Sequence, residues 1–392
     1  QVGPFSAYVS YVRDHRRGDI RNIGQFWNWD RTASAVKINR GVERTVPYLG
    51  STSSHSAFAA VKFETGAFTT VYKFDWNKDD YTAPANLLTG INTSFPGVGA
   101  FLAALTTTQP FPVIIASDGK RPKTANNTWV VPAKGRASGH SVTSTLTVSD
   151  QISLKNILAY RVTRNFAASS VAGIDALPIT SQAAPLLGLP ASMIGQPFVG
   201  VGTQANFKSR QISNEFQINY NSDFLTAVAG GLYFLGKDDE NDSLLQPSTS
   251  FFPVFNSVLT NRNIGRSFNR AESIAGYGQF EVHLTPQFDV ILGGRITRDD
   301  KSGYLDTGAT IPTIVRTVFG NKDTRFTYLL GANYKPNRDT LLYGKYSTAF
   351  VSGGTVAGIP FDAETVKSFE IGAKVDLFDR KLRTNIALYH AK

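Results

Sequence analysis

Apolar and polar residues alternate strictly near the end of the sequence. Between residues 368 and 377, every second position is apolar, and the positions between are small, polar or charged. The apolar set is Phe369, Ile371, Ala373, Val375 and Leu377, and the other set is Ser368, Glu370, Gly372, Lys374 and Asp376. Because successive side chains of a β-strand point to opposite faces, this pattern predicts a strand with one apolar and one polar face.

The same alternation recurs along the chain, and the connections follow a pattern of their own. We predict about thirteen strands, at residues 5–13, 57–64, 68–77, 140–148, 152–163, 211–220, 224–235, 273–284, 288–298, 326–335, 341–350, 365–377 and 382–389. Tight polar turns such as Thr65-Gly66 and Asp379-Arg380 alternate with long loops. One of these loops contains a predicted short helix at residues 98–105.

Alternating tight turns and long loops are typical of outer-membrane β-barrels, with the turns at one rim and the loops at the other. The mean hydropathy of −0.15 does not oppose this, because a barrel strand needs about ten residues and half of them are apolar. A soluble sandwich or propeller has no reason to place every long connection at one end. We therefore predict an all-β fold, a transmembrane antiparallel β-barrel with long extracellular loops and short periplasmic turns. We expect it to be partial, because closed bacterial barrels have even strand numbers.

Composition excludes several classes of site. The chain has no cysteine, which excludes disulfides, thiolate metal sites and cysteine nucleophiles, and its five histidines supply a zinc site poorly. The net charge of +10 favours anionic partners such as lipopolysaccharide or an acidic ligand. The Lys and Arg residues are scattered and form no stripe, which argues against nucleic acid. No catalytic set is identifiable, so we predict neither an enzyme nor a cofactor.

Several stretches of the second half share one family's pattern. They are SNEF (213–216), AGYGQF (275–280) with HLT (283–285) and GGRITRDDK (293–301), NYKP (333–336) with LYGKYS (342–347), and FDAETV (361–366) with FEIGAK (369–374) and LFD (377–379). These stretches resemble mid-barrel strands of TonB-dependent outer-membrane receptors. The resemblance is specific from about residue 209 onward and patchy before it. The chain departs from the family where Thr348-Ala349 precede Phe350, since the family often has Arg-Gly there.

The resemblance implies a 22-stranded barrel occluded by an N-terminal plug, in the outer membrane of a Gram-negative bacterium. External loops would capture a scarce substrate such as a ferric siderophore, haem, cobalamin or an oligosaccharide. The TonB–ExbB–ExbD complex would supply energy through the plug. Residues 1–392 would then be the barrel domain, incomplete at both ends, with the plug and TonB box outside it. A passive porin without a plug is the main alternative, and an outer-membrane enzyme or an adhesin is a further one.

Three acidic groups follow predicted strands, namely Asp79-Asp80, Asp238-Asp239-Glu240 with Asp242, and Asp299-Asp300. Such carboxylates could hold Ca²⁺ or a cationic ligand at the outer rim. We favour the alternative of a solvated rim, because no EF-hand-like spacing is present.

Three loop segments are candidates for ligand contact. The uncharged loops 90–117 and 176–207 either fold over a ligand or pack on each other or on lipopolysaccharide. The basic, aromatic stretch 16–44 suits an anionic ferric chelate or a lipopolysaccharide phosphate equally well.

Other motifs are assigned to structure. Gly276-Tyr277-Gly278 lies inside a predicted strand and no helix follows, so it is not a nucleotide loop. His140 and His283 are lone strand residues and are interpreted as structural. No individual residue is assigned to ligand, metal or catalysis.

Overall fold

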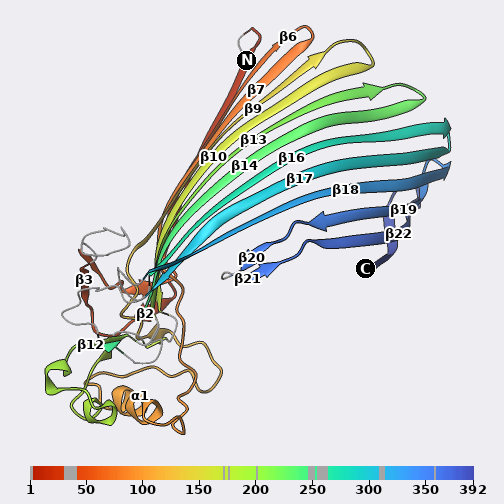
Figure 1. The fold of residues 1–392 in the computed structure, drawn as a ribbon. Helices are drawn as coiled ribbons and strands as arrows, with labels where there is room; N and C mark the ends of the chain where they lie inside the picture. The colour runs from red at the N-terminus through yellow and green to blue at the C-terminus, as the bar shows by residue number, and fades with distance from the viewer. Residues whose placement is uncertain are drawn as a thin grey trace.

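The computed structural model describes residues 3–30, 42–170, 173–174, 177–199, 202–245, 252–253, 264–308, 314–356 and 359–392. Figure 1 shows a large curved sheet with a smaller assembly of loops at one end of its strands.

The main sheet has 13 strands, and every neighbouring pair is antiparallel. In spatial order the strands are β1 (Phe5–Arg16), β6 (Thr52–Thr65), β7 (Phe68–Tyr81), β9 (Ala133–Thr147), β10 (Ile152–Ser170), β13 (Gly202–Asn221), β14 (Leu225–Leu245), β16 (Ile264–Thr285), β17 (Phe288–Gly308), β18 (Val315–Asn337), β19 (Thr340–Val351), β22 (Glu364–Leu377) and β23 (Leu382–Ala391). This order is also the chain order, so each long strand pairs with the next one along the sequence. The predicted strand number and all-β class are confirmed.

Strand ends were predicted well at the tight turns and poorly at the loops. The predicted strand 288–298 is β17, which begins at Phe288 as expected but runs on to Gly308. Likewise, the predicted strand 224–235 is β14, which extends to Leu245. The missing halves carry charged residues on both faces, so they lack the alternation that reveals a strand. Cross-strand hydrogen bonding continues through them all the same.

The turn after β22 uses an unusual backbone. Phe378, Asp379 and Arg380 have φ angles of 55°, 54° and 66°. These are left-handed values, which aspartate tolerates better than most residues. The side chain of Arg380 donates from Nε to Asp339 in the neighbouring turn, at 3.1 Å. The Asp379-Arg380 turn is therefore tied to the preceding turn at the same rim.

The long loops form the remaining elements. They are α1 (Val98–Thr107), two 3₁₀ turns at Ala184–Leu187 and Ala191–Met193, and the short strands β2 (Ile20–Asn22), β3 (Asn28–Asp30), β4 (Val42–Arg44), β5 (Tyr48–Leu49), β8 (Thr124–Ala125), β11 (Leu177–Pro178), β12 (Pro197–Val199), β15 (Phe252–Pro253), β20 (Gly354–Val356) and β21 (Ile359–Phe361). The helix expected at residues 98–105 is confirmed. Among the described residues, no helix has the length and apolar character needed to cross a membrane.

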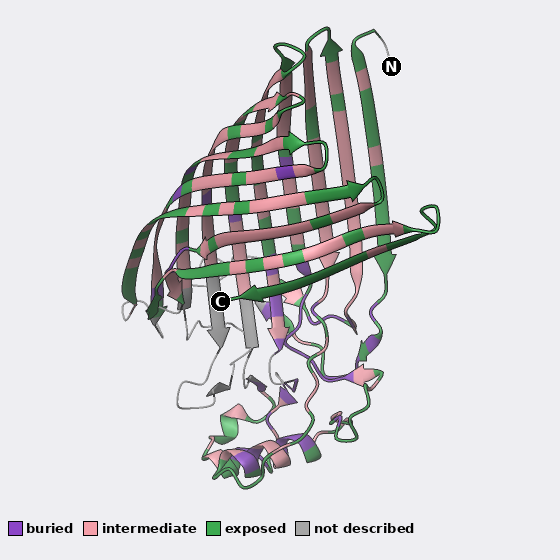
Figure 2. Cartoon of the chain, turned by 90° about the vertical axis from the view of Figure 1, so that its right-hand side faces the viewer, coloured by how far each residue is buried: buried purple, intermediate pink, exposed green. Residues whose placement is uncertain are grey.

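The buried core lies mainly in the loops rather than on the sheet, as Figure 2 shows at the loop end of the strands. One cluster joins α1 to the 177–199 loop through Phe101, Leu105, Ile179 and Phe198. A second cluster joins the first loop to the 83–130 segment through Ile20, Leu49 and Val130. Both faces of the main sheet carry large side chains that remain exposed or half-buried.

Candidate functional site

The cross-strand register separates an apolar face of the main sheet from a polar face, because directly opposite residues share a face. Phe369 and Ile371 of β22 stand on the apolar face and are 50% and 45% exposed. Their neighbours Glu370 and Gly372 stand on the polar face. A sheet that buries neither face within the chain must find its apolar partner elsewhere, and for a barrel that partner is lipid.

The polar face of β19 and β22 carries a connected set of charged and phenolic groups. Tyr343 donates from its hydroxyl to Glu370 Oε1 at 2.7 Å, and Lys345 Nζ lies 3.0 Å from Glu370 Oε2. Lys374 Nζ lies 5.8 Å from the centre of the Tyr343 ring. Each polar or charged group of the set therefore contacts another member of it.

A second set of the same composition lies on the polar face of β13, β16 and β17. The hydroxyl of Tyr277 donates to Glu215, and Gln217 Nε2 donates to the same carboxylate oxygen at 3.0 Å. The Arg295 guanidinium lies 5.7 Å from the centre of the Tyr277 ring. The polar face is thus lined by repeated groups of a carboxylate, a tyrosine and a cation.

Glycines make room for these tyrosines. Gly372 stands directly opposite Tyr343, and Gly230 stands directly opposite Tyr277. A Cβ on Gly372 would lie 2.5 Å from Tyr343 Cζ, and one on Gly230 would lie 2.7 Å from the Tyr277 hydroxyl oxygen. Each ring therefore lies over a glycine, in the position where a side chain would otherwise stand.

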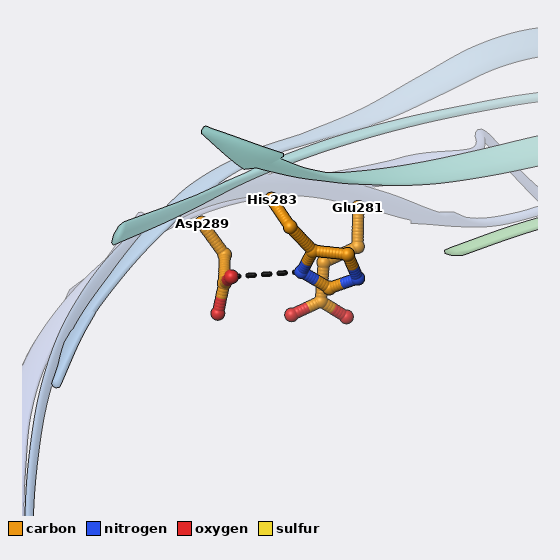
Figure 3. Close-up of side chains that lie close together, drawn as sticks. All are labelled: Glu281, His283 and Asp289. Atoms are coloured by element: carbon orange, nitrogen blue, oxygen red, sulfur yellow. Dashed lines mark hydrogen bonds and ion pairs between the residues drawn. The ribbon is translucent and has the colours of Figure 1, made fainter. Parts of the chain in front are cut away.

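One further cluster occurs near the turn ends of β16 and β17 (Figure 3). Glu281, His283 and Asp289 hold their ligand-type atoms within 4.8 Å of one another, and no other group of this kind occurs in the described part of the chain. His283 Nδ1 lies 2.8 Å from Asp289 Oδ1. The residues around this cluster determine whether it can take a metal.

The cluster is already satisfied by protein groups. Lys335 Nζ lies 2.7 Å from Asp289 Oδ2, so an ammonium stands where a cation would bind. Thr226 Oγ1 lies 3.1 Å from His283 Nε2, and Asn333 Nδ2 donates to Glu281 at 3.4 Å. The arrangement is an internal hydrogen-bond network, which agrees with the interpretation of His283 as structural. His140 is likewise engaged, with its Nδ1 2.8 Å from the Tyr72 hydroxyl oxygen.

The acidic groups expected at the outer rim lie inside strands and do not converge. Asp79 and Asp80 belong to β7, Asp299 and Asp300 belong to β17, and Asp238 to Asp242 belong to β14. Neighbouring residues of a strand point to opposite faces, so two adjacent carboxylates cannot bind one cation together. Among the described residues, none of these acids belongs to a group of three ligand-type atoms close enough to hold a metal ion. Asp80 instead pairs with Lys78 at 3.3 Å, and Asp300 pairs with Lys322 at 3.1 Å. The expectation that these acids stand beyond the strand ends is therefore wrong.

The basic, aromatic stretch 16–44 is partly structural, and its residues 31–41 lie outside the described chain. Trp29 is fully buried, its ring centre lies 4.8 Å from that of Trp129, and its Nε1 donates to the Thr128 carbonyl at 3.0 Å. Two of the arginines cover aromatic rings, Arg17 over Tyr48 and Arg44 over Phe26.

The two uncharged loops pack on each other. The ring centres of Phe101 and Phe198 lie 4.8 Å apart, and the hydroxyl oxygens of Thr108 and Thr180 lie 2.7 Å apart. Residues 176 and 200–201 of the second loop lie outside the described chain. This packing was one of the two alternatives for these loops, and ligand contact by their exposed parts stays a proposal.

Comparison with known proteins identifies the family. The family model for the TonB dependent receptor-like β-barrel matches residues 47–392. This chain belongs to that family. The family of TonB-dependent receptors and the barrel class predicted from the sequence are both confirmed. No curated protein sequence matches the chain.

Solved structures of receptors share the fold. The ferric yersiniabactin uptake receptor FyuA from Yersinia pestis superposes with a TM-score of 0.70 at 13% identity, covering 100% of this chain and 50% of that one. The siderophore receptor PiuA from Acinetobacter baumannii superposes with a TM-score of 0.63 at 15% identity, and the match covers 99% of this chain and 53% of that one. The open form of the ferric-catecholate import receptor Fiu from E. coli K12 superposes with a TM-score of 0.61 at 12% identity, and the match covers 99% of this chain and 55% of that one. This chain therefore spans about half the length of the receptors it matches.

The sets around Glu370 and Glu215 were not predicted from the sequence. Alternation places each of these residues on the polar face, which is a usable signal. It does not say which residues meet, because that depends on the pairing of neighbouring strands.

Proposed function

We propose that this chain is barrel sequence of an outer-membrane TonB-dependent receptor that imports a scarce ferric chelate. The observation that carries the proposal is the two-faced antiparallel sheet, apolar on one side and lined by paired charges on the other. Large side chains of the apolar face, such as Phe369 and Ile371, stay about half exposed within the described chain, and a barrel would place them against lipid with the paired charges inside. The ferric chelate is chosen among the possible substrates because FyuA is named as a ferric yersiniabactin uptake receptor, Fiu as a ferric-catecholate import receptor and PiuA as a siderophore receptor.

Energy for release is proposed to come from TonB–ExbB–ExbD, acting through a plug that lies outside residues 1–392. In this proposal the whole described chain is one barrel domain, incomplete at both ends. The proposed location is the outer membrane of a Gram-negative bacterium, and membership of the receptor family supports it.

The loop end supplies the features for capturing an anionic chelate. Arg17, Arg21 and Arg44 are exposed there, and Tyr48 and Phe26 accompany two of them. Guanidinium groups next to aromatic rings suit planar anionic ligands.

The test is uptake of radioactive iron, given as a panel of ferric siderophores, by cells that express the intact gene product. Uptake that disappears when TonB is deleted supports an energised receptor. Uptake that is independent of TonB, together with steady conductance of the purified protein in planar bilayers, would favour the passive channel instead. The coding sequence upstream of Gln1 provides a second test, since an energised receptor requires a plug and a TonB box there.

A further inference from the structure

Basic side chains form a line across the apolar face of six neighbouring strands. The line consists of Arg13 (β1), His55 (β6), Lys78 (β7), Arg136 (β9), Arg164 (β10) and Lys208 (β13), each directly opposite the next. We call this line the cationic row. The prediction that the basic residues form no stripe is therefore wrong. The stripe runs across the strands, so its members lie far apart in the sequence.

By itself the cationic row is electrostatically unfavourable. Directly opposite residues of a sheet have Cβ atoms about 5 Å apart, and like charges in that position destabilise the pairing. Lys78 has a partner in Asp80, at 3.3 Å. Over the described ranges, no carboxylate forms an ion pair with Arg13, Arg136 or Arg164. All three of these arginines are exposed, so the row is open to an external anion.

Part of the row surrounds a hollow. Arg136, Arg164 and Lys208, together with Lys134, line a hollow of about 400 Å³. Asp239, the cross-strand neighbour of Lys208, is the carboxylate in the same lining. Guanidinium groups bind phosphate oxygens through two parallel hydrogen bonds, and an ammonium adds a third donor group. The hollow has the charge and the donors for a phosphate group.

The row lies at the edge of the lipid-facing band. On β7 the apolar face carries Phe68, Tyr72, Phe74 and Trp76, and Lys78 is the next residue on that face. The ten residue steps from Phe68 to Lys78 measure about 33 Å along the strand. At a tilt of about 45° they rise about 23 Å, close to the height of the apolar band of an outer-membrane barrel. The row therefore stands at the depth of lipid headgroups on the loop side.

We propose that the cationic row binds the phosphate groups of lipids in the outer leaflet. The ligand is an amphiphile rather than free phosphate or nucleic acid, because the apolar face continues directly below the hollow with Val162 and Tyr160. Acyl chains lie against that face while the phosphates occupy the row. The inference rests on the outer-membrane location in the proposed function and is independent of substrate transport.

The test is thermal unfolding of the intact gene product in a zwitterionic detergent, with bisphosphorylated lipid A as the probe. Lipid A without phosphates and inorganic phosphate at equal concentration are the comparison ligands. The variant is Arg136→Gln with Arg164→Gln and Lys208→Gln. The matched control is Arg270→Gln with Arg316→Gln and Lys322→Gln, which removes cations of the same face that are already paired with acids.

We expect bisphosphorylated lipid A alone to raise the unfolding temperature of the unmodified protein. The triple variant is expected to bind it about a hundredfold more weakly, from the loss of three basic groups near the membrane surface. Without lipid, the same variant is expected to be at least as stable as the parent, because repulsion within the row is relieved. The control variant keeps the response to lipid. Stability lost equally with and without lipid would instead mean that the row is structural.

An equal response to inorganic phosphate, or an unchanged response in the triple variant, would overturn the lipid site. These results are separable from those of the uptake test. A protein that responds to lipid A but imports nothing contradicts the transport proposal alone, whereas one that imports substrate without responding to lipid A contradicts the lipid site alone.

Discussion

Above the lipid-facing band, two regions of the same face carry charge differently. From β1 to β13 the basic side chains of the row stand opposite one another. On β16, β17 and β18, three cations instead pair with acids, as Arg270 with Glu272, Lys322 with Asp300, and Arg316 with Asp306. The second region satisfies these charges internally, whereas in the first region Arg13, Arg136 and Arg164 have no acid partner among the described residues.

The polar face shows no such contrast. Arg161 pairs with Asp75 at 2.7 Å in the first region, and Lys345 pairs with Glu370 at 3.0 Å in the last strands. Ion pairs therefore occur on the polar face in both places, and the contrast described above concerns the apolar face.

The largest expected effect tests whether the apolar face meets lipid at all. Ile371→Arg is expected to destabilise the protein by about 2–4 kcal/mol, because it places a charge near the middle of the bilayer. Thr365→Arg, on the same strand and face beyond the band, should cost only about 0–1 kcal/mol. Unfolding in lipid vesicles measures both. Equal, small effects would show that β22 does not face the hydrocarbon.

The second-largest expected effect tests the packing of the polar face, where Tyr343 lies over Gly372. Gly372→Ala is expected to cost about 1–3 kcal/mol, because the new methyl group collides with the Tyr343 ring. Gly276→Ala is the control, since an added Cβ there meets nothing within 4 Å. Denaturant titration of both variants measures the difference in unfolding free energy. Equal destabilisation in both would contradict the role of Gly372 in making room for the Tyr343 ring.

A smaller effect is expected from removing one ion pair of β17 and β18, that of Arg316 with Asp306. Arg316 donates two hydrogen bonds to Asp306, at 2.7 and 2.8 Å, and holds the pKa of that carboxyl below its ordinary value. Asp306 lies well beyond the ten or so strand residues nearest the turn that cross the bilayer. We expect Asp306→Asn to cost about 1 kcal/mol at pH 7, a modest figure because the arginine is half exposed.

The pH dependence gives this prediction its sign. A lowered pKa means that the stabilisation is present above the ordinary value of about 4 and is lost as the pH falls through the folded-state pKa. The difference in unfolding free energy between Asp306→Asn and the parent should therefore shrink below about pH 4. Asp299→Asn is the control, since its carboxylate pairs with no cation in the described part of the chain. A difference that stays constant with pH would contradict the ion pair.

The smallest expected effect comes from placing an acid in the cationic row, so that this region carries an ion pair as β16 to β18 do. Arg136→Glu places an acid between Lys78 and Arg164, and it should raise the unfolding free energy in lipid-free detergent by about 0.2–1 kcal/mol. Arg270→Glu, in the paired region, should lower it because the new acid stands beside Glu272. Equilibrium unfolding measures the free energy of unfolding of both variants. A change of the same sign in both would contradict the difference in charge pairing between the two regions.

The loops show where sequence reasoning was limited. The 90–117 and 176–207 segments are uncharged and interrupted by prolines, so they show no period that predicts an element beyond the short helix. Their core, with Phe101 against Phe198, forms between residues nearly a hundred positions apart. Nothing local in either segment indicates that the other will cover it.

The acidic groups show a second limit. From the sequence, Asp299-Asp300 is predicted to follow the end of a strand, because charged residues interrupt the apolar alternation there. The strand continues because backbone hydrogen bonds to β16 and β18 do not depend on side-chain polarity. Above the membrane both faces of a sheet meet water, so alternation stops there although pairing does not.

The sequence by itself determined the number of strands, their turn ends, and which residues share a face, because these follow from local alternation and turn chemistry. Only the tertiary structure decided which residues stand opposite one another, because register is a relation between strands. That relation seats Tyr343 over Gly372, satisfies His283 with Asp289, and gathers Arg136, Arg164 and Lys208 around one hollow. The faces are properties of single strands, whereas the sites are properties of their pairing.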